Sequence, residues 1–361
     1  MVSSPGTAEG SAVKRTKQIG IVAVLALLLV AGGFAYWHWK GAGNGSDRMD
    51  LLGEIPGDPT AVVFLDFADF RKSVFLSQLF AWAPRPPVDA DYQQFADATG
   101  FLYERDLDRV ALAFTRTPSR STTVAVADGR FDRKKIEGYA AQHGVRLDQK
   151  GAAVFAISSA ETRRTSYFLF LDNTRVAWTN DPELAGSLAQ KRGAKISAEW
   201  REHFERLGGS PVFGLIRQDD ALLSALAQQA PGGYRSPQLA TLLGQLEWIS
   251  IGGKAEGPLM RVAAEGECAD EATMRDLSNT LSGLLILAQA GLNSPQSRKE
   301  LDPAVRAAYL DLLKSADVEK VDRGSTKSVR IVFDITSALL AAARASALPG
   351  APPPAETPRA K

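Results

Sequence analysis

Three patterns of apolar and polar residues divide this chain of 361 residues. Residues 19–39 form a continuous apolar run without a formal charge, residues 58–345 alternate short apolar stretches with amphipathic ones, and residues 346–361 are rich in Pro. Long apolar runs are typical of membrane-spanning helices, and the shorter patterns are typical of strands and helices in a folded domain. The chain therefore predicts a membrane anchor, a folded domain and a disordered C-terminal tail.

The apolar run has the length and the flanking residues of a single transmembrane helix. Its 21 residues, at about 1.5 Å each, span a hydrocarbon core of about 30 Å. The flanking residues are Lys14, Arg15 and Lys17 on one side and Tyr36, Trp37 and Trp39 on the other. Because basic flanks stay in the cytoplasm, residues 1–18 are expected to be a cytoplasmic tail. The rest of the chain is then expected on the far side of a bacterial inner membrane, in the periplasm or outside the cell.

A cleaved signal peptide is the alternative interpretation of the same segment. Residues 19–30 alone satisfy an apolar h-region of about 7–15 residues, and Gly33 and Ala35 are small residues near a cleavage position. The apolar run continues beyond such a region and ends in aromatic residues, which favours an uncleaved anchor. Residues 40–57, which contain the sequence GAGNGSD, are expected to be a linker.

The folded part contains two similar successions of strands and helices. Three pairs of segments match in order: 61–79 with 211–229, 108–132 with 247–270, and 167–190 with 318–342. We predict an internal duplication, with one repeat over residues 58–192 and another over residues 196–345. The competing explanation is that one strand–helix unit resembles another by physical pattern alone.

The two-residue period of adjacent hairpins predicts the α+β class, with an antiparallel sheet and helices on one face. An additional hairpin is expected near Val154, and a long loop at residues 293–302. Several Asp residues stand where helices are expected to begin, as N-cap or first-turn carboxylates. They are Asp69, Asp132, Asp181, Asp219 or Asp220, Asp270 and Asp334.

The helix expected after Asp270 contains the apolar sequence LSGLLILAQA. Its unbroken apolar stretch is only about eight residues long, which is too short for a second membrane crossing. We expect it to be a core helix of the second repeat.

Charge and cysteine content exclude several classes of protein. Lys and Arg number 42 and Asp and Glu number 41, for a formal net charge of +1. The first 40 residues carry +3, so the remainder is mildly acidic, at −2. Because non-specific affinity for nucleic acid comes mainly from basic surfaces, no nucleic-acid partner is expected. The single cysteine, Cys268, excludes an intramolecular disulfide and is expected to be a buried apolar residue.

The histidines of the folded part form no metal or catalytic motif. His143 precedes Gly144 at an expected helix end, where a cation complements the helix dipole and Gly supplies a left-handed cap. His203 is expected at the rim of a helix whose buried side holds Trp200 and Phe204. Metal-ligand, phosphate-loop and nucleophile-elbow motifs do not occur. We therefore predict no metal, no cofactor and no identifiable catalytic residue.

Carboxylates are the remaining candidates for catalysis. Asp66 and Asp69 form one pair, and Glu104 with Asp106 and Asp108 forms a second group. General acid catalysis needs one such acid in an apolar setting. Asp66 closes an expected strand and Asp69 opens an expected helix, so structural roles are expected for both.

The segment FAWAPRPP, at residues 80–87, is the stretch most typical of a partner-binding loop. Its candidate contact residues are Trp82, Pro84 and Pro86. In the alternative interpretation this loop is tucked under its own domain.

In architecture, the chain resembles functionally uncharacterised bacterial single-pass membrane-anchored proteins with a duplicated α+β ectodomain. The resemblance rests on the N-terminal anchor and on an ectodomain that opens with AVVFLDFADF, and it implies no activity. Two hypotheses remain open. The chain is a non-enzymatic envelope protein that binds or assembles with an extracytoplasmic partner, or it is an envelope hydrolase whose catalytic carboxylates the sequence does not identify.

Overall fold

The computed structural model describes residues 45–75, 90–116, 120–149, 152–158, 164–190, 196–218 and 244–347. The predicted cytoplasmic tail, the predicted transmembrane segment and the candidate contact residues Trp82, Pro84 and Pro86 lie outside these ranges. Asp219, Asp220 and all but the first two residues of the predicted C-terminal tail also lie outside them. Within the described ranges, no helix combines the length and the apolar character needed to cross a membrane.

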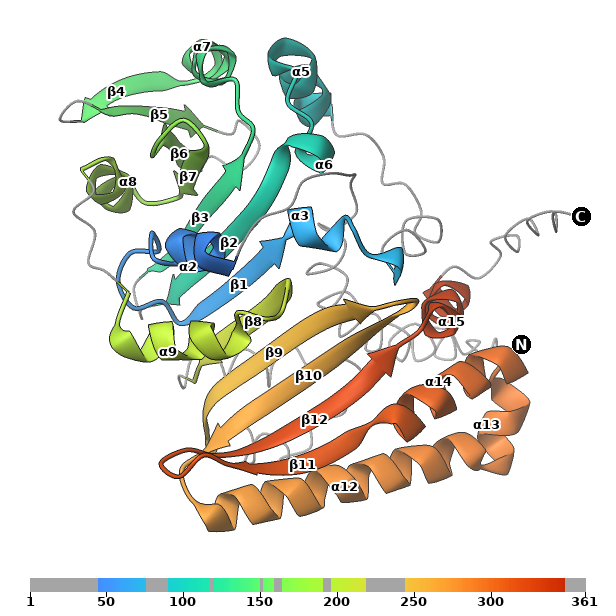
Figure 1. The fold of residues 1–361 in the computed structure, drawn as a ribbon. Coiled ribbons are helices and arrows are strands. Elements are labelled where there is room, and N and C mark those ends of the chain that lie inside the picture. The colour runs from blue at the N-terminus through green and yellow to red at the C-terminus, as the bar shows by residue number, and fades with distance from the viewer. Residues whose placement is uncertain are drawn as a thin grey trace, which may run out of the picture.

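The strands of the described ranges form a single antiparallel sheet of twelve strands (Figure 1). Their order is β11-β12-β10-β9-β8-β1-β2-β3-β7-β6-β5-β4. In chain order the strands are β1 (Ala61–Asp66), β2 (Leu107–Arg116), β3 (Ser121–Gly129), β4 (Val145–Gln149), β5 (Ala152–Ser158), β6 (Thr165–Phe170), β7 (Arg175–Thr179), β8 (Val212–Arg217), β9 (Leu246–Glu256), β10 (Leu259–Cys268), β11 (Asp317–Asp322) and β12 (Lys327–Ile335). A large antiparallel sheet packed with helices confirms the α+β class.

The centre of the sheet is the antiparallel pair β1–β8, which joins the two halves of the chain. Phe64 of β1 lies opposite Phe213 of β8. Outward from β1 the order is β2, β3, β7, β6, and outward from β8 it is β9, β10, β12, β11. Beyond β6 the first half adds the β5–β4 hairpin, which confirms the additional hairpin near Val154.

Helices lie on both faces of the sheet, which corrects the expectation of a single helical face. Phe64 belongs to the same buried cluster as Leu51 of α2 (Gly45–Leu52), whereas Leu65 belongs to the cluster of Leu339 of α15 (Ser337–Ala347). Because neighbouring residues of a strand point to opposite faces, α2 and α15 lie on opposite sides. These are called here the α2 face and the α15 face.

The two halves differ in how their faces are covered. In the first half, α8 (Pro182–Ala189) packs on β5, β6 and β7 on the α2 face, and α7 (Arg133–His143) packs on β4 and β5 from the other side. In the second half, α12 (Glu271–Asn293) packs on β10, β11 and β12, beside α14 (Pro303–Ser315). Helix α9 (Ala198–Leu207) covers Trp248 near the start of β9 on the α2 face, and no other helix of the described ranges covers that face of β9, β10 and β12 (Figure 1). The remaining helices are α3 (Phe67–Phe70), α5 (Ala90–Thr99), α6 (Tyr103–Asp106) and α13 (Pro295–Glu300).

The predicted linker 40–57 is folded from Gly45 onward. Helix α2 occupies its middle, and Leu51, Leu52 and Ile55 are almost fully buried against the sheet. Apolar burial of this kind is the main stabilising term of a fold. The Gly- and Ser-rich start of the segment conceals a short helix whose stability comes from residues distant in the sequence.

Four of the predicted helix starts are confirmed, and Asp69 lies in the first turn of α3, whose N-cap is Asp66. Asp132, Asp181 and Asp270 are the N-caps of α7, α8 and α12, and each accepts hydrogen bonds from backbone amides. The helix start expected at Asp334 is wrong. This residue lies in β12, which pairs with β10 through its last residue, and its carboxylate binds Arg261 at 3.0 Å.

Two further expectations about the second half are corrected. The predicted loop at residues 293–302 contains the short helix α13. Helix α12 forms as predicted, but it is not a core helix throughout. Its buried residues are Met274, Leu277 and Ser278, all in its N-terminal half. The later residues Leu284, Ile286 and Leu287 are exposed.

Candidate functional site

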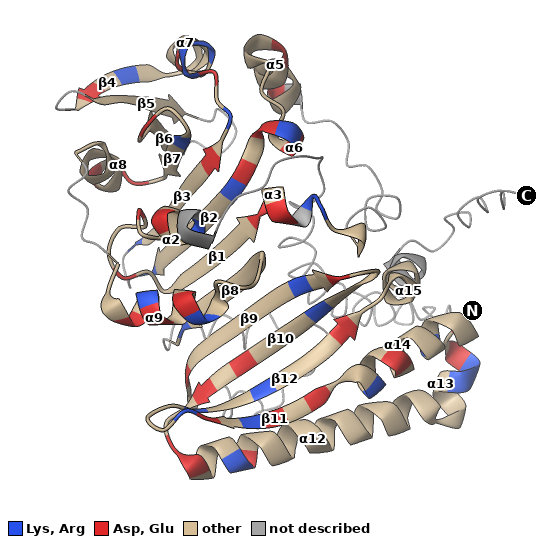
Figure 2. Ribbon diagram, viewed as in Figure 1, with Lys and Arg blue, Asp and Glu red and all other residues tan. Residues whose placement is uncertain are grey.

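A hollow of about 310 Å³ lies on the α2 face of the second half. Strands β9, β10 and β12 form its floor, and α9 with Ser210 forms one wall. Its cationic residues are Arg206, Lys254, Arg261, Arg323 and Arg330, and its acidic residues are Glu256, Glu265 and Glu267. The lining cations outnumber the lining acids by two, and both signs mark the floor strands in Figure 2. Arg261 and Arg330 also pair with Asp334 and Glu319, which lie beside the lining residues. This feature is called the basic hollow.

The polar floor follows from the two-residue period of β10. Arg261, Ala263, Glu265 and Glu267 line the basic hollow, whereas Val262 is buried in the apolar cluster on the α15 face. An antiparallel strand with one face on the core and one in solvent alternates in this way. The sequence showed the alternation, but it did not show that the charged side would remain open.

Glu265 is held by more donors than any other carboxylate of the hollow. Arg323 donates to both of its oxygens, Arg330 Nη2 donates to Oε2 at 2.9 Å, and Ser328 Oγ donates to Oε1 at 2.7 Å. Burial alone would raise the pKa of Glu265, but these hydrogen bonds outweigh burial and lower the pKa to about 2. Glu265 is therefore ionised at neutral pH. Two guanidinium groups share this carboxylate, and Arg330 Nη1 also lies 4.0 Å from Glu319 Oε2.

The prediction that His203 lies at the rim of its helix is wrong, because the residue is buried. Its Nε2 lies 3.1 Å from Glu267 Oε1, and its ring stacks on Trp248 with centroids 4.0 Å apart. Its Nδ1 lies 2.8 Å from the backbone oxygen of Glu199. Arg206 Nη2 lies 2.6 Å from the same Glu267 oxygen. Burial alone would raise the pKa of Glu267, but His203 and Arg206 outweigh it and lower the pKa.

Lys254 supplies a cation that is not paired within the hollow. Its side chain is exposed, and it forms no ion pair with any residue the structure describes. Gly252, two residues earlier on the same face, lets the wall approach the floor. A Cβ atom at this position would lie 2.9 Å from Ser210 Oγ, so a larger residue would push the wall outward.

The basic hollow is suited to electrostatic binding of an anion. Glu265 and Glu267 have lowered pKa values, so at neutral pH they accept hydrogen bonds and donate no proton. Arg guanidinium groups present several donors in a plane, which match carboxylate and phosphate oxygens. Across the described ranges, His, Cys, Asp and Glu side chains form no group of three or more that could hold a metal ion.

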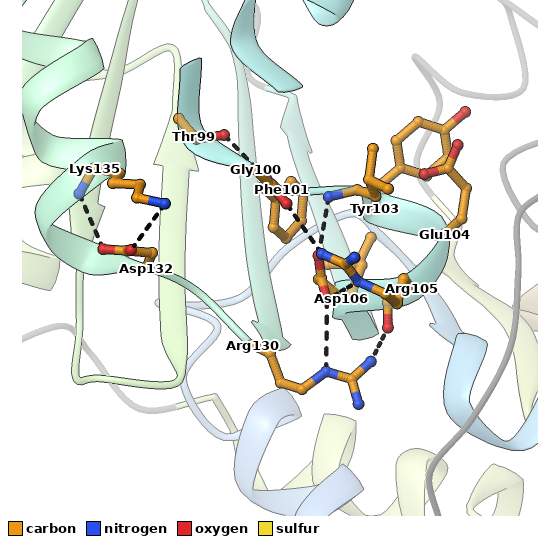
Figure 3. A network of polar contacts seen from close by, with 12 residues as sticks. Thr99, Gly100, Phe101, Tyr103, Glu104, Arg105, Asp106, Arg130, Asp132 and Lys135 are labelled. Carbon is orange, nitrogen blue, oxygen red and sulfur yellow. Dashed lines mark hydrogen bonds and ion pairs between the residues drawn. The ribbon is translucent and has the colours of Figure 1, made fainter. Parts of the chain in front are cut away.

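The second set of candidate carboxylates includes Asp106 of α6, which lies in a network of hydrogen bonds and ion pairs within the fold (Figure 3). Asp106 accepts hydrogen bonds from Arg105 Nε at 2.8 Å and from the backbone N–H of Leu102 at 3.0 Å. Arg130 Nε lies 3.7 Å from Asp106 and the same guanidinium donates to the backbone oxygen of Arg105. Burial alone would raise the pKa of Asp106, but the bonds from Arg105 and Leu102 lower it. Asp106 therefore ties α6 to the residue that follows β3.

The other two members of this group have different partners. The Tyr92 hydroxyl donates to Glu104 Oε2 at 3.2 Å, and Arg71 forms an ion pair with Asp108. Burial, reinforced by the Glu104 carboxylate, raises the pKa of Tyr92. Glu104, Asp106 and Asp108 thus act in separate contacts.

Arg48 of α2 donates hydrogen bonds to both members of the other candidate carboxylate pair, Asp66 and Asp69. Its Nε donates to Asp66 Oδ2 at 2.7 Å and its Nη2 to Asp69 Oδ2 at 2.8 Å. Asp66 is the N-cap of α3, because its Oδ1 accepts from the backbone N–H of Asp69 at 2.8 Å. Arg48 Nη1 also donates to the backbone oxygen of Gly208 at 2.8 Å. This guanidinium therefore connects α2, the end of β1 and the end of α9.

The position of His143 at a helix end is confirmed, but the left-handed cap at Gly144 is wrong. Gly144 has an extended backbone, with φ −155°. His143 Nδ1 lies 2.9 Å from the backbone oxygen of Tyr139, and the two rings stack. Glycine is needed at 144 for a different reason. A Cβ atom there would lie 2.5 Å from the backbone oxygen of Ala156.

The prediction that Cys268 is a buried apolar residue is confirmed. Its exposed fraction is 5%, and it packs with Met274 and Leu277 of α12. Burial raises the pKa of its thiol to about 11. Cys268 is therefore a core residue rather than a reactive one.

No protein-family model and no curated protein matches this chain. Among solved structures, crystal form III of TP0453 is similar with a TM-score of 0.44 and 10% sequence identity, covering 83% of this chain and 98% of that one. Crystal form IV of TP0453 gives a TM-score of 0.43 and 11% identity, covering 83% and 98%. Crystal form I gives a TM-score of 0.42 and 10% identity, covering 85% and 99%. Similarity at this level gives no basis for assigning a function.

Proposed function

We propose that this protein is a single-pass membrane-anchored envelope protein that binds an extracytoplasmic partner without changing it chemically. The observation that carries the proposal is the basic hollow, in which lining cations outnumber lining acids by two and Lys254 forms no ion pair with a described residue, on a chain that is at −2 beyond residue 40. A local excess of one sign of charge in a cleft concentrates ligands of the opposite sign. The partner therefore presents a carboxylate or phosphate group to the hollow.

The membrane anchor is part of this proposal. Residues 19–39 have the composition of a transmembrane helix, and the described part of the chain begins at Gly45. The five residues between them span at most about 18 Å when extended. Helix α2 and the basic hollow lie on the same face of the sheet, so the hollow is carried on the side of the domain where the anchor attaches.

Internal duplication explains why the hollow is open. The strand orders outward from β1 and from β8 agree for five strands, which supports repeats over residues 58–192 and 196–345. After its last strand, the first half places α8 on the α2 face, whereas the second half places α15 on the opposite face. We infer that the repeats diverged at this helix, and that the uncovered floor became a binding surface.

Site-specific photo-crosslinking in cells tests the binding proposal. A photoreactive residue replaces Ser250, which lines the hollow, in the full chain. We expect one discrete adduct, reduced at least about tenfold when Lys254→Glu is added, because charge reversal repels an anionic partner. Lys134→Glu, on exposed α7, is the matched control and leaves the adduct unchanged. An adduct insensitive to Lys254→Glu, or none at all, contradicts the proposal.

The hydrolase alternative has its own test. The purified full chain is assayed against envelope-type esters, peptides and glycans. Hydrolysis that disappears in Glu267→Gln without a change in melting temperature would overturn the non-enzymatic proposal.

Anchor topology is tested by the mass of the mature protein and by labelling. An intact N-terminus, with an exposed Val145→Cys labelled only from the periplasmic side, is the expected result. A new N-terminus between Gly32 and Gly43 would show a cleaved signal peptide instead.

A further inference from the structure

The C-terminal half of α12 exposes an apolar stripe. Leu284, Ile286 and Leu287 have exposed fractions of 46%, 67% and 68%. Large apolar side chains that gather on a surface mark an interaction site, whereas single ones need no explanation. In the N-terminal half of the same helix, Met274 and Leu277 face the core. With about 3.6 residues per turn, Leu287 lies on a side of α12 turned away from Met274 and Leu277, and Leu284 and Ile286 flank it on either side.

The charge distribution along α12 limits what can cover this stripe. No charged residue occurs between Asp276 and Arg298, and Figure 2 shows this part of the helix free of charged positions. The start of the helix is acidic in excess, because Asp270, Glu271 and Asp276 outnumber Arg275. The residues after it are basic in excess, with Arg298, Lys299 and Glu300. A neutral apolar centre thus separates an acidic end from a basic end.

We propose that the stripe is the contact surface for a second copy of this chain, formed by two α12 helices packed antiparallel. A two-fold contact uses the same patch on both copies. Antiparallel packing places the apolar centres together and the acidic end of each helix beside the basic end of the other. Gly283 and Gly291, which have open space where a Cβ would lie, let the two backbones approach closely.

A lipid surface fits the stripe less well. The acidic start of α12 is repelled by anionic headgroups, whereas helices that lie on membranes carry mainly Lys and Arg on their polar side. Helix α12 also lies on the α15 face, opposite to α2, where the chain enters the fold. Three large side chains form a contact smaller than the roughly 800 Å² per partner of a stable complex. The dimer is therefore weak, and the dimeric fraction rises with protein concentration.

Disulfide trapping tests the contact in the full chain purified in detergent. Cys268→Ala removes the native thiol, and Ile286→Cys places a new one within the stripe. Mild oxidation is expected to give a covalent dimer at least about tenfold faster than with Val145→Cys, whose native side chain is equally exposed (64%) but lies on β4. Adding Leu287→Glu abolishes trapping, and the control Val74→Glu does not.

Charge exchange tests the antiparallel arrangement. Arg298→Glu and Asp276→Arg each slow trapping, and the double variant restores it, provided circular dichroism shows all three folded. Trapping at Ile286→Cys no faster than at Val145→Cys overturns the proposal. It is also overturned if the reconstituted chain stays monomeric while the Ile286→Cys thiol is shielded from a water-soluble reagent by phosphatidylglycerol vesicles, because the stripe then faces lipid.

Discussion

Phe64 and Phe213 lie directly opposite each other in β1 and β8, and their rings stack with centroids 5.0 Å apart at an interplanar angle of 23°. Both rings are almost fully buried. The pair sits where the two halves of the chain meet. The halves therefore share one sheet and one core at this point, and we expect them to unfold together.

Replacing Phe64 with Ala tests this shared core. The change leaves a cavity at the central strand pair, so we expect a loss of about 3–5 kcal/mol in the free energy of unfolding, the usual cost for a buried Phe. Urea unfolding followed by tryptophan fluorescence and by circular dichroism should show one transition in both proteins. Phe114→Ala, at a position 39% exposed, is the milder control. Two separate transitions would show independent halves.

Replacing Arg48 with Met should destabilise the fold by about 3–5 kcal/mol, because it leaves the buried Asp66 carboxylate without its cation. The side chains of Arg48 and Asp66 are only 10% and 3% exposed. Lys135→Met removes an exposed ion pair with Asp132 at the start of α7 and should cost less than about 1 kcal/mol. Chemical denaturation measures both. Equal effects of the two substitutions would show that Arg48 does not organise α2.

Stability should fall in acid partly through Glu265. Its pKa is lowered from 4.5 to about 2 in the folded protein. The contribution is therefore fully present above pH 4.5 and is lost as the pH falls toward 2. The shift corresponds to a stabilisation of up to about 3 kcal/mol. Unfolding free energies at pH 5.5 and pH 3 should differ less in Glu265→Gln than in the native chain. An unchanged difference would mean that other groups carry the acid sensitivity.

Cys268 should resist thiol reagents in the folded protein. Burial raises its pKa to about 11 from 9.0, so the thiolate fraction at pH 8 falls about 100-fold, and access is blocked as well. Reaction with a chromogenic disulfide should be slow in buffer and fast in urea. Cys268→Ala should fold, with a loss of about 1 kcal/mol. Rapid labelling of the native chain would contradict the buried position.

Local signals in the sequence predicted the elements that depend on local chemistry. Asp132, Asp181 and Asp270 identified helix starts because an N-cap carboxylate binds amides two or three residues away. The hairpin near Val154 followed from alternating residues on either side of a turn. These interactions are complete within a few residues, so the sequence alone contains them.

Features that depend on distant partners were not predictable in this way. Residues 45–52 look like a linker until Leu51 and Leu52 meet the sheet, and Arg48 finds Asp66 only in the folded state. His203 was predicted on the rim because the Trp248 ring and the Glu267 carboxylate that enclose it come from β9 and β10. The basic hollow depends on which side of the sheet α15 takes, which hydrophobic periodicity does not determine.

The central position of β1 in the sheet also has a consequence for folding while the chain is being synthesised. Strand β1 pairs with β2 along one edge and with β8 along the other, and β8 follows about 150 residues after β1. At a synthesis rate of about 5–20 residues per second, β8 is made roughly 7–30 s after β1. During this interval β1 presents unpaired backbone amides and carbonyls, the feature by which nascent strands associate wrongly. In the finished sheet the outermost strands are β4 and β11, and the latter carries Asp317, Glu319, Lys320 and Asp322. The chain is thus most exposed to misassembly before its second half emerges, and least exposed once the charged outer strands are in place.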